Sequence, residues 1–334
     1  MKILAIETSC DETCAAVTEE LSILSNVIWS QIDLHREFGG VVPSIARRAH
    51  QDKIDWVVDK ALKEAGVTLN EIGAVAVTVG PGLAIALEVG ITKAKQLATQ
   101  WQKPLLAINH VEGHIVSSLV NHPQIICPAM ALVVSGGHTE LILVTEIGKY
   151  QIVARTIDDA LGEALDKAAR MLGLGYPGGA ELEKLAREGN IKRYKLPLPM
   201  AGRESQNEFS YSGLKSAFFR LVNSPGEKSY PDLAAAFQNR AFEHLTRVMG
   251  KTLNRYQIQD LLVGGGVAAN KELSARLQKL GGDTGLKVHL PAKGLYGDNA
   301  AMIGMAAGFK AERREFVKNI EEVDRQPRLR VDQV

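Results

Sequence analysis

The feature that most constrains this fold is a three-strand unit that occurs twice. Residues 2–31 are expected to contain three strands joined by two short polar turns, and residues 129–157 repeat this order. Runs of β-branched and other apolar residues bounded by turn residues are typical of strands. A unit that recurs in this way indicates two lobes related by duplication. The alternative is coincidence, because three-strand meanders are common.

Between and after the repeats, strands alternate with helices. Strands are expected at 74–79 and 104–108, and each is followed by a helix; a later strand at 260–263 leads into a helix at 270–280. This alternation indicates an α/β protein with partly parallel sheets. Residues 190–212 have few periodic apolar residues and are expected to form an extended loop.

The length of 334 residues is too great for one ordinary core and suits two lobes. We expect an N-terminal lobe at 1–128, completed by a helix at 299–315, and a C-terminal lobe at 129–298. Residues 318–334 are charged and are expected to be frayed.

Composition excludes several classes of protein. Hydrophobic residues make up 46% and charged residues 23%, which is typical of a globular protein. The net charge of +1 argues against a generally basic nucleic-acid coat, but it allows a local basic patch. Three unpatterned cysteines fit a reducing compartment. Without a recognisable signal peptide or an apolar run of membrane-spanning length, we expect a cytoplasmic protein.

Two histidines have the spacing of metal ligands. His110 and His114 lie four residues apart on an expected helix, so their Cβ atoms are about 5–6 Å apart on one face. Two imidazoles in this arrangement can share a metal ion, but a third ligand must come from elsewhere in the chain. The alternative is a pair of ordinary surface histidines.

The same spacing also occurs in zinc proteases, where a general-base glutamate directly follows the first histidine. Here that position is Val111, and Glu112 lies one residue later. Glu112 is therefore about 200° around the helix from His110 and faces away from the metal. This geometry argues against a protease.

Three glycine-rich turns follow expected strands or precede helices: Ser135-Gly136-Gly137, Gly178-Gly179 and Gly264-Gly265-Gly266. Backbone amides in such turns can bind a phosphate, which indicates a nucleotide site. The alternative is tight packing at strand ends. Neither a Walker motif nor a GxGxxG fingerprint occurs in the sequence.

Acidic residues mark two further turns. Asp11 and Glu12 follow the first strand and could bind a metal, position a phosphate or simply be solvated. Asp298 precedes the last expected helix, where it suits an N-cap or the missing third metal ligand.

These motifs together resemble the bacterial tRNA N6-adenosine threonylcarbamoyltransferases, a family once regarded as glycoproteases. The resemblance runs from Met1 to about residue 315. It is carried by six motifs in the same order: Ile6-Glu7-Thr8-Ser9-Cys10-Asp11-Glu12-Thr13, His110-Val111-Glu112-Gly113-His114, Val134-Ser135-Gly136-Gly137-His138-Thr139, Phe209-Ser210-Tyr211-Ser212-Gly213-Leu214-Lys215, Val263-Gly264-Gly265-Gly266-Val267-Ala268-Ala269-Asn270 and Gly297-Asp298-Asn299-Ala300-Ala301-Met302.

The resemblance implies an actin-like, sugar-kinase-like (ASKHA) fold with two related lobes around a nucleotide cleft. It also implies that His110, His114 and Asp298 bind one Fe2+ or Zn2+ ion per chain. The residues implied to hold the adenylate or threonylcarbamoyl part of the substrate are Val133, Val134, Ser135, Gly136, Gly137, Asp166, Gly179, Glu183 and Asn270.

The activity implied by the resemblance is transfer of a threonylcarbamoyl group from threonylcarbamoyl-AMP to N6 of an adenosine beside the anticodon, in tRNAs that read ANN codons. AMP leaves, and ATP, ADP or AMP can occupy the same site. Asp11 or Glu12 is our candidate for the general base. The implied partners are tRNA, a paralogue of the same fold (TsaB-like), a small P-loop ATPase (TsaE-like) and an upstream threonylcarbamoyl-AMP synthase, without a membrane.

Basic residues are expected to bind the tRNA phosphates even though the net charge is only +1. The loop 190–212 is the best candidate because it contains several of them. The full set of candidates is Arg47, Arg48, Lys192, Arg193, Lys195, Arg203 and Lys215. Two other functions remain open: a metabolite kinase or ATPase of the same fold, and a non-catalytic scaffold paralogue. Neither of them predicts the histidine pair.

Overall fold

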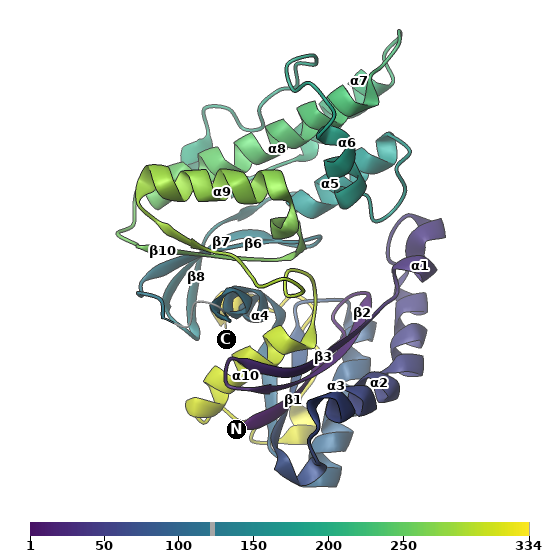
Figure 1. Ribbon diagram of the computed structural model, residues 1–334, viewed down its shortest axis with the longest axis vertical. Coiled ribbons are helices and arrows are strands. Elements are labelled where there is room, and N and C mark those ends of the chain that lie inside the picture. Colours follow the sequence, from purple (N-terminus) through teal and green to yellow (C-terminus); the bar gives the residue numbers. More distant parts are fainter. Residues whose placement is uncertain (121–123, 334) are drawn as a thin grey trace. The chain divides into compact units, whose positions relative to one another are not determined.

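The computed structural model describes residues 1–120 and 124–333, and its contacts divide the chain into two compact units (Figure 1). The first unit comprises Met1–Gln124, Glu146–Tyr150 and Pro291–Val334. The second unit comprises Ile125–Thr145 and Gln151–Leu290.

The first unit is built on a five-stranded sheet in the order β3-β2-β1-β4-β5. β1 pairs antiparallel with β2, whereas β4 and β5 extend the sheet in parallel. β1 is buried along its length except at Lys2, because both faces of the sheet are covered. The strands are β1 (Lys2–Glu7), β2 (Glu12–Glu19), β3 (Ser22–Ser30), β4 (Ile72–Gly80) and β5 (Leu105–Asn109).

Helices cover both faces of this sheet. α2 and α3 pack against β2, β3 and β4, while α10 lies on β1, β2 and the short helix α4. Gly304 allows α10 to approach β2 closely, because a Cβ there would lie 2.4 Å from Thr18 Oγ1. The helices are α1 (Ile32–His35), α2 (Pro43–Ala65), α3 (Ala84–Trp101), α4 (His110–Val116) and α10 (Ala300–Glu312).

The second unit has a six-stranded sheet in the order β11-β10-β6-β7-β8-β9. β6 pairs antiparallel with β7, and β10 and β11 extend the other side in parallel. The strands are β6 (Ala129–Val134), β7 (Thr139–Glu146), β8 (Lys149–Thr156), β9 (Glu208–Phe209), β10 (Asp260–Gly264) and β11 (Lys287–His289).

Five helices accompany this sheet, and α5, α6, α8 and α9 pack in sequence on one another. Among the helices of the described residues, none has both the length and the apolar character needed to cross a bilayer. The helices are α5 (Leu161–Met171), α6 (Gly179–Ala186), α7 (Ser212–Val222), α8 (Tyr230–Leu253) and α9 (Lys271–Thr284).

The two sheets share one topology. In each sheet an antiparallel meander of three strands is extended by two parallel strands beside the first: β4 and β5 in the first unit, β10 and β11 in the second. This common order confirms the duplication expected from the sequence. The loop expected at 190–212 contains more regular structure than expected: a short 3-10 helix forms at Glu204–Gln206, β9 pairs with β8, and α7 begins at Ser212.

The C-terminal segment also differs from expectation. Instead of fraying, it packs on the first unit, where Val317 N donates to Leu105 O at 2.9 Å and Val331 is 1% exposed. Ile320, Val323 and Leu329 pack against the core of this unit. These apolar residues are too widely spaced to produce a periodic pattern, which is why the sequence suggested a frayed tail.

Candidate functional site

The histidine pair and Asp298 come together in the first unit. α4 begins at His110 because the Asn109 side chain caps it, accepting from Val111 N and Glu112 N. His110 Nε2 and His114 Nε2 lie 3.5 Å and 3.2 Å from Asp298 Oδ1. One ligand atom from each of the three residues lies within 4.8 Å of the others, so the group could hold a metal ion.

The chemistry of these side chains fits a metal ion. His114 is fully buried; within the described part of the chain its Nδ1 has no hydrogen bond, and its Nε2 has the contact with Asp298 alone. A buried imidazole normally has a hydrogen-bond partner. Burial lowers the pKa of His114 and outweighs the opposing effect of Asp298, and the nearby His110 lowers it further, so the ring is neutral and has a lone pair to donate.

Glu7 binds the ring nitrogen of His110 that faces away from Asp298. It is fully buried at the end of β1, and its Oε2 lies 3.1 Å from His110 Nδ1. Thr78 Oγ1 donates to the same oxygen at 2.5 Å, and Ser9 N donates to Oε1. A carboxylate on the second ring nitrogen orients a metal-binding histidine. We did not single out Glu7 from the sequence; a buried acidic residue that ends an apolar strand was the available signal.

Opposing effects set the protonation of His110. Burial lowers its pKa, but the negative charges of Asp298 and Glu7 outweigh burial and raise the pKa to about 9. His110 and His114, whose ring centroids are 4.7 Å apart, therefore differ in protonation before a cation arrives. A cation on the Nε2 atoms would replace the proton as the partner of Asp298.

The acidic turn lies near this cluster. Burial, together with the charges of Asp11 and Asp298, raises the pKa of Glu12 well above its ordinary value. Glu12 Oε1 accepts a hydrogen bond from Ser30 Oγ at 3.2 Å, and Asp11 O accepts from Gln31 N. The structure therefore brings Glu12 into the electrostatic environment of the predicted metal ligands.

Glu112 lies outside the histidine–aspartate cluster. It is fully buried, and its Oε1 accepts a hydrogen bond from Tyr150 OH at 3.2 Å. This contact agrees with the expectation that Glu112 faces away from the metal, and it gives the residue a packing role.

In the second unit, the turn after β6 is held by its own side chain. Ser135 N donates to His138 O at 2.9 Å, and Gly137 N donates to Ser135 Oγ at 3.3 Å. Val133 and Val134 are buried strand residues, so only their backbones could contact a ligand. Added Cβ atoms at Gly136 and Gly137 would meet nothing within 4 Å, which leaves space beside the turn.

Asp166 on α5 organises the second glycine turn. Its Oδ1 accepts from Gly178 N at 2.9 Å and from Gly179 N at 2.8 Å. These two amides therefore bind a protein carboxylate, whereas the sequence suggested that they bind a phosphate. The structure does bring Asp166 and Gly179 together, as expected for parts of one site.

Glu183 and Asn270 meet where α6 approaches the start of α9. Glu183 Oε1 accepts from Lys271 N at 3.1 Å and forms an ion pair with Arg187. Asn270 caps α9 through its Oδ1, and its Nδ2 donates to Gln238 Oε1 at 3.0 Å. Both side chains thus have structural partners in addition to any contact with substrate.

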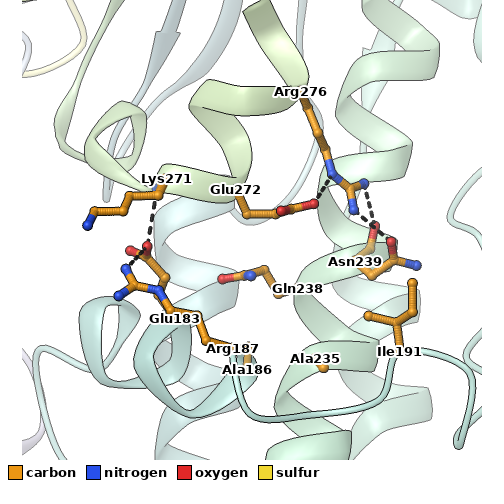
Figure 2. Close-up of a pocket in the computed structure, with 10 residues that line it drawn as sticks. All are labelled: Glu183, Ala186, Arg187, Ile191, Ala235, Gln238, Asn239, Lys271, Glu272 and Arg276. Carbon is orange, nitrogen blue, oxygen red and sulfur yellow. Dashed lines mark hydrogen bonds and ion pairs between the residues drawn. The ribbon is translucent and has the colours of Figure 1, made fainter. Parts of the chain in front are cut away.

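A cavity of about 450 Å³ lies beside these residues in the second unit, and Figure 2 shows the polar and apolar residues that line it. Arg276 donates to Glu272 Oε1 at 2.7 Å and to Asn239 Oδ1 at 2.7 Å, so its guanidinium is fixed at one end. Glu183 and Arg187 lie at the other end. The lining residues are Glu183, Ala186, Arg187, Ile191, Ala235, Gln238, Asn239, Lys271, Glu272 and Arg276.

Several of the basic residues expected to bind tRNA already have acidic partners. Arg47 pairs with Glu88, Arg193 with Asp232, and Lys215 with Asp159. The other four are exposed on the surface: Arg48, Lys192, Lys195 and Arg203.

Comparison with solved structures shows the fold. The T. kodakarensis HypF structure matches 93% of this chain and 48% of its own, with a TM-score of 0.64 and 13% identity. The Acidaminococcus fermentans (R)-2-hydroxyglutaryl-CoA dehydratase component A matches 94% of this chain and 99% of its own, at a TM-score of 0.56 and 13% identity. A Thermus thermophilus ROK hexokinase matches 94% of this chain and 100% of its own, with a TM-score of 0.52 and 15% identity. The chain therefore has the actin-like, sugar-kinase-like fold.

Comparison with sequences shows the family. The family model for tRNA N6-adenosine threonylcarbamoyltransferase (TsaD) matches residues 22–305. Relatives of that name from a Cyanothece species and from Clostridium perfringens are each 48% identical; the matches cover 93% and 92% of this chain, and 92% of each relative. A Thermosipho africanus relative is 44% identical over 93% of this chain and 94% of its own. With the six motifs and the histidine–aspartate cluster in place, this chain belongs to the tRNA N6-adenosine threonylcarbamoyltransferase family.

Proposed function

We propose that this protein transfers a threonylcarbamoyl group from threonylcarbamoyl-AMP to N6 of an adenosine beside the anticodon in tRNAs that read ANN codons. The observation that carries the proposal is the cluster of His110, His114 and Asp298 in a member of this acyltransferase family. A metabolite kinase of the same fold, or a scaffold paralogue, has no need of this cluster, and nothing in the structure favours either.

The reaction forms one bond and breaks another. The N6 amine attacks the carbamoyl carbon, the bond from that carbon to the phosphate oxygen breaks, and AMP leaves with the electron pair. A proton must leave the amine as the new C–N bond forms. We assign its removal to Glu12 or Asp11, because the raised pKa of Glu12 makes this carboxylate a stronger base than an exposed one.

We assign one Fe2+ or Zn2+ ion to His110, His114 and Asp298. When bound, it would supply Lewis-acid polarisation and a template for the adenylate or acyl group. Glu7 holds His110 through Nδ1, which keeps Nε2 directed at Asp298. This contact would orient His110 as a metal ligand.

We assign the adenylate to the second unit. Asp166 fixes the Gly178–Gly179 backbone, and Glu183 links α6 to α9 beside the 450 Å³ cavity, which has the size of a small-ligand pocket. Two of the three N–H groups of the Ser135–Gly137 turn are used within the turn, so we assign the contact with developing negative charge to Gly136 N–H.

The partners and the domain boundaries also remain proposals. We propose that the chain acts with tRNA, a TsaB-like paralogue and a TsaE-like ATPase, and that a separate synthase supplies the threonylcarbamoyl-AMP. We propose lobes at 1–128 with 299–315 and at 129–298; the compact units differ from these bounds in that the first unit also contains residues 291–298, and so Asp298.

The proposal is tested by supplying purified protein, metal and partner proteins with labelled threonylcarbamoyl-AMP and tRNA. Label should appear on the tRNA adenosine, and AMP should be released in equal amount. The double variant His110→Ala/His114→Ala should lose both the transfer and its metal, which normally binds at about one ion per chain. The buried His289→Gln serves as the matched control, because His289 pairs with Asp260 outside the cluster. Phosphorylation of a small molecule without transfer to tRNA would overturn the proposal.

A further inference from the structure

The C-terminal segment crosses the end of the sheet that carries the metal cluster. After α10 the chain returns to the sheet, and Gln326 N donates to Val79 O at 2.7 Å, at the C-terminal end of β4. Val331 is 1% exposed, so the last part of the segment is anchored in the unit. Residues 326–331 are called the strap from here on. In Figure 1 this end of the chain lies beside α4.

The strap contacts the backbone of the first unit directly. A Cβ added to Gly80 would lie 1.9 Å from Gln326 O, so only glycine permits this approach. Gly82 N donates to Pro327 O at 3.2 Å. The backbone at Gly80 therefore lies so close to the strap that not even a methyl group fits between them.

The strap also contacts Asn109, the residue that caps α4. Leu329 O accepts a hydrogen bond from Asn109 Nδ2 at 3.4 Å. On its other side, Asn109 Oδ1 accepts from Val111 N at 2.8 Å and from Glu112 N at 3.3 Å. An asparagine amide has a donor on one side and an acceptor on the other, so a carbonyl at the donor side fixes the acceptor toward the helix.

A second route leads from the strap to His110. Val79, which binds the strap, follows Thr78, and Thr78 donates to Glu7, the partner of His110 Nδ1. Beyond Gly82, Leu83 N donates to Ser9 O at 2.8 Å, and Ser9 Oγ lies 3.2 Å from His110 Nδ1. Both supports of His110, Glu7 and Ser9, are therefore hydrogen-bonded to residues that directly follow or precede backbone bound by the strap.

We propose that the strap is a positioning element of the metal centre, which fixes Asn109 and the Gly80–Gly82 turn so that His110 is held in register with His114 and Asp298. The inference rests on the metal site assigned under Proposed function. Metal ligands must be held within about 0.5 Å of their productive positions, and loss of an outer support typically costs about 10–100-fold in affinity. In this proposal the strap acts through Asn109, Glu7 and Ser9.

The test displaces the strap without removing any residue. Gly80→Ala places a methyl group against Gln326, whereas Gly40→Ala adds the same group where nothing lies within 4 Å. Hydrogen exchange is measured on both metal-free proteins and the metal-free wild type, and Zn2+ affinity is measured by competition with a chelator. The exchange measurement reports on the strap and on the Val111 and Glu112 amides separately.

We expect Gly80→Ala to speed exchange in the strap, to speed exchange of the Val111 and Glu112 amides about tenfold, and to weaken Zn2+ binding about tenfold. Gly40→Ala should match the wild type in all three. The inference is overturned if the strap is released while the α4 amides and Zn2+ affinity stay at wild-type values.

Two further variants keep the inference testable. If Gly80→Ala leaves the strap protected, a chain lacking residues 326–334 is measured in its place. Faster exchange of the α4 amides and weaker Zn2+ binding in that chain would support the inference, and wild-type values of both would overturn it. If that chain does not fold, Asn109→Asp keeps the acceptor for α4 and removes the donor to Leu329 O; unchanged exchange in the strap and in α4 would refute the link. A wild-type protein that binds neither Zn2+ nor Fe2+ would refute the metal site, while exchange of the α4 amides would still decide the role of the strap.

Discussion

His50 on α2 holds the acidic turn that carries our candidate base. Its Nε2 donates to Cys10 O at 3.0 Å, which leaves Nδ1 to accept from Thr13 Oγ1 at 2.8 Å. Burial lowers the pKa of His50, so the neutral ring can make both contacts at once. The two bonds bracket Asp11 and Glu12, which fixes the direction in which their carboxylates leave the backbone.

The assignment of the base predicts a rate effect at single residues. Glu12→Gln and Asp11→Asn keep the shape of each side chain but remove its basic oxygen. One of them should slow single-turnover transfer to tRNA by about 10²–10⁴-fold, the usual contribution of a general base. Glu20→Gln, in the exposed turn between β2 and β3, is the matched control. Near-normal rates in both Asp11→Asn and Glu12→Gln would remove these residues from the proton transfer.

Among the elements, the start of α7 is tethered by one carboxylate. Asp158 accepts hydrogen bonds from Ser210 Oγ at 2.5 Å, Tyr211 N at 2.8 Å and Ser212 Oγ at 2.7 Å. Partial burial raises the pKa of Asp158, but these bonds outweigh it and hold the pKa below its ordinary value of 3.8. The tether attaches the end of the long loop to the segment that follows β8.

The tether predicts a pH dependence of stability. Since the pKa of Asp158 is lower in the folded state, its stabilising contribution is complete above the ordinary value and is lost as the pH falls through the folded value. Asp158→Asn should lower the free energy of unfolding at neutral pH by about 1 kcal/mol, after allowance for solvent screening of this exposed group. The difference from wild type should shrink below about pH 4. Urea titrations across pH, with the exposed Asp283→Asn as control, check this; a constant difference would contradict it.

The loop before this tether is our candidate contact with tRNA. Arg193 pairs with Asp232, and the other basic residues of the loop, Lys192, Lys195 and Arg203, are exposed. Lys192→Glu/Lys195→Glu should weaken tRNA binding and flatten its salt dependence by about 1–2 in the slope of log K against log salt. Lys251→Glu/Lys279→Glu makes the same charge change at exposed sites elsewhere in this unit. If both double variants show equal slopes, the loop does not contact phosphates.

For the whole molecule, the metal cluster lies entirely in the first unit and the 450 Å³ cavity entirely in the second. A ligand that binds only the folded state stabilises it by about 2.7 kcal/mol at 100 times its dissociation constant. Zn2+ should therefore slow hydrogen exchange most strongly in α4 and α10, and AMP should slow it most strongly in α6 and α9. Equal protection of both units by either ligand would contradict the separate assignment of the two sites.

The sequence by itself determined most of the fold and two of the three residues of the candidate metal site. Strand and helix positions follow from short-range apolar patterns, and His110 and His114 share a face through helical spacing alone. The duplicated meander was visible because each copy is a continuous segment. Asp298 could be named only through the resemblance to a known family, because no local spacing connects it to α4.

Only the tertiary structure decided what surrounds these residues. Glu7 supports His110 across 103 positions, and Leu329 binds Asn109 across 220 positions; neither distance leaves a periodic trace in the sequence. The same holds for Asp166, whose carboxylate occupies the amides of a turn that sequence alone assigned to a phosphate. Short-range patterns record which face of an element is buried, whereas the partners across that face depend on how the elements pack. For that reason the C-terminal segment, expected to fray, proved to be packed against the unit that holds the metal cluster.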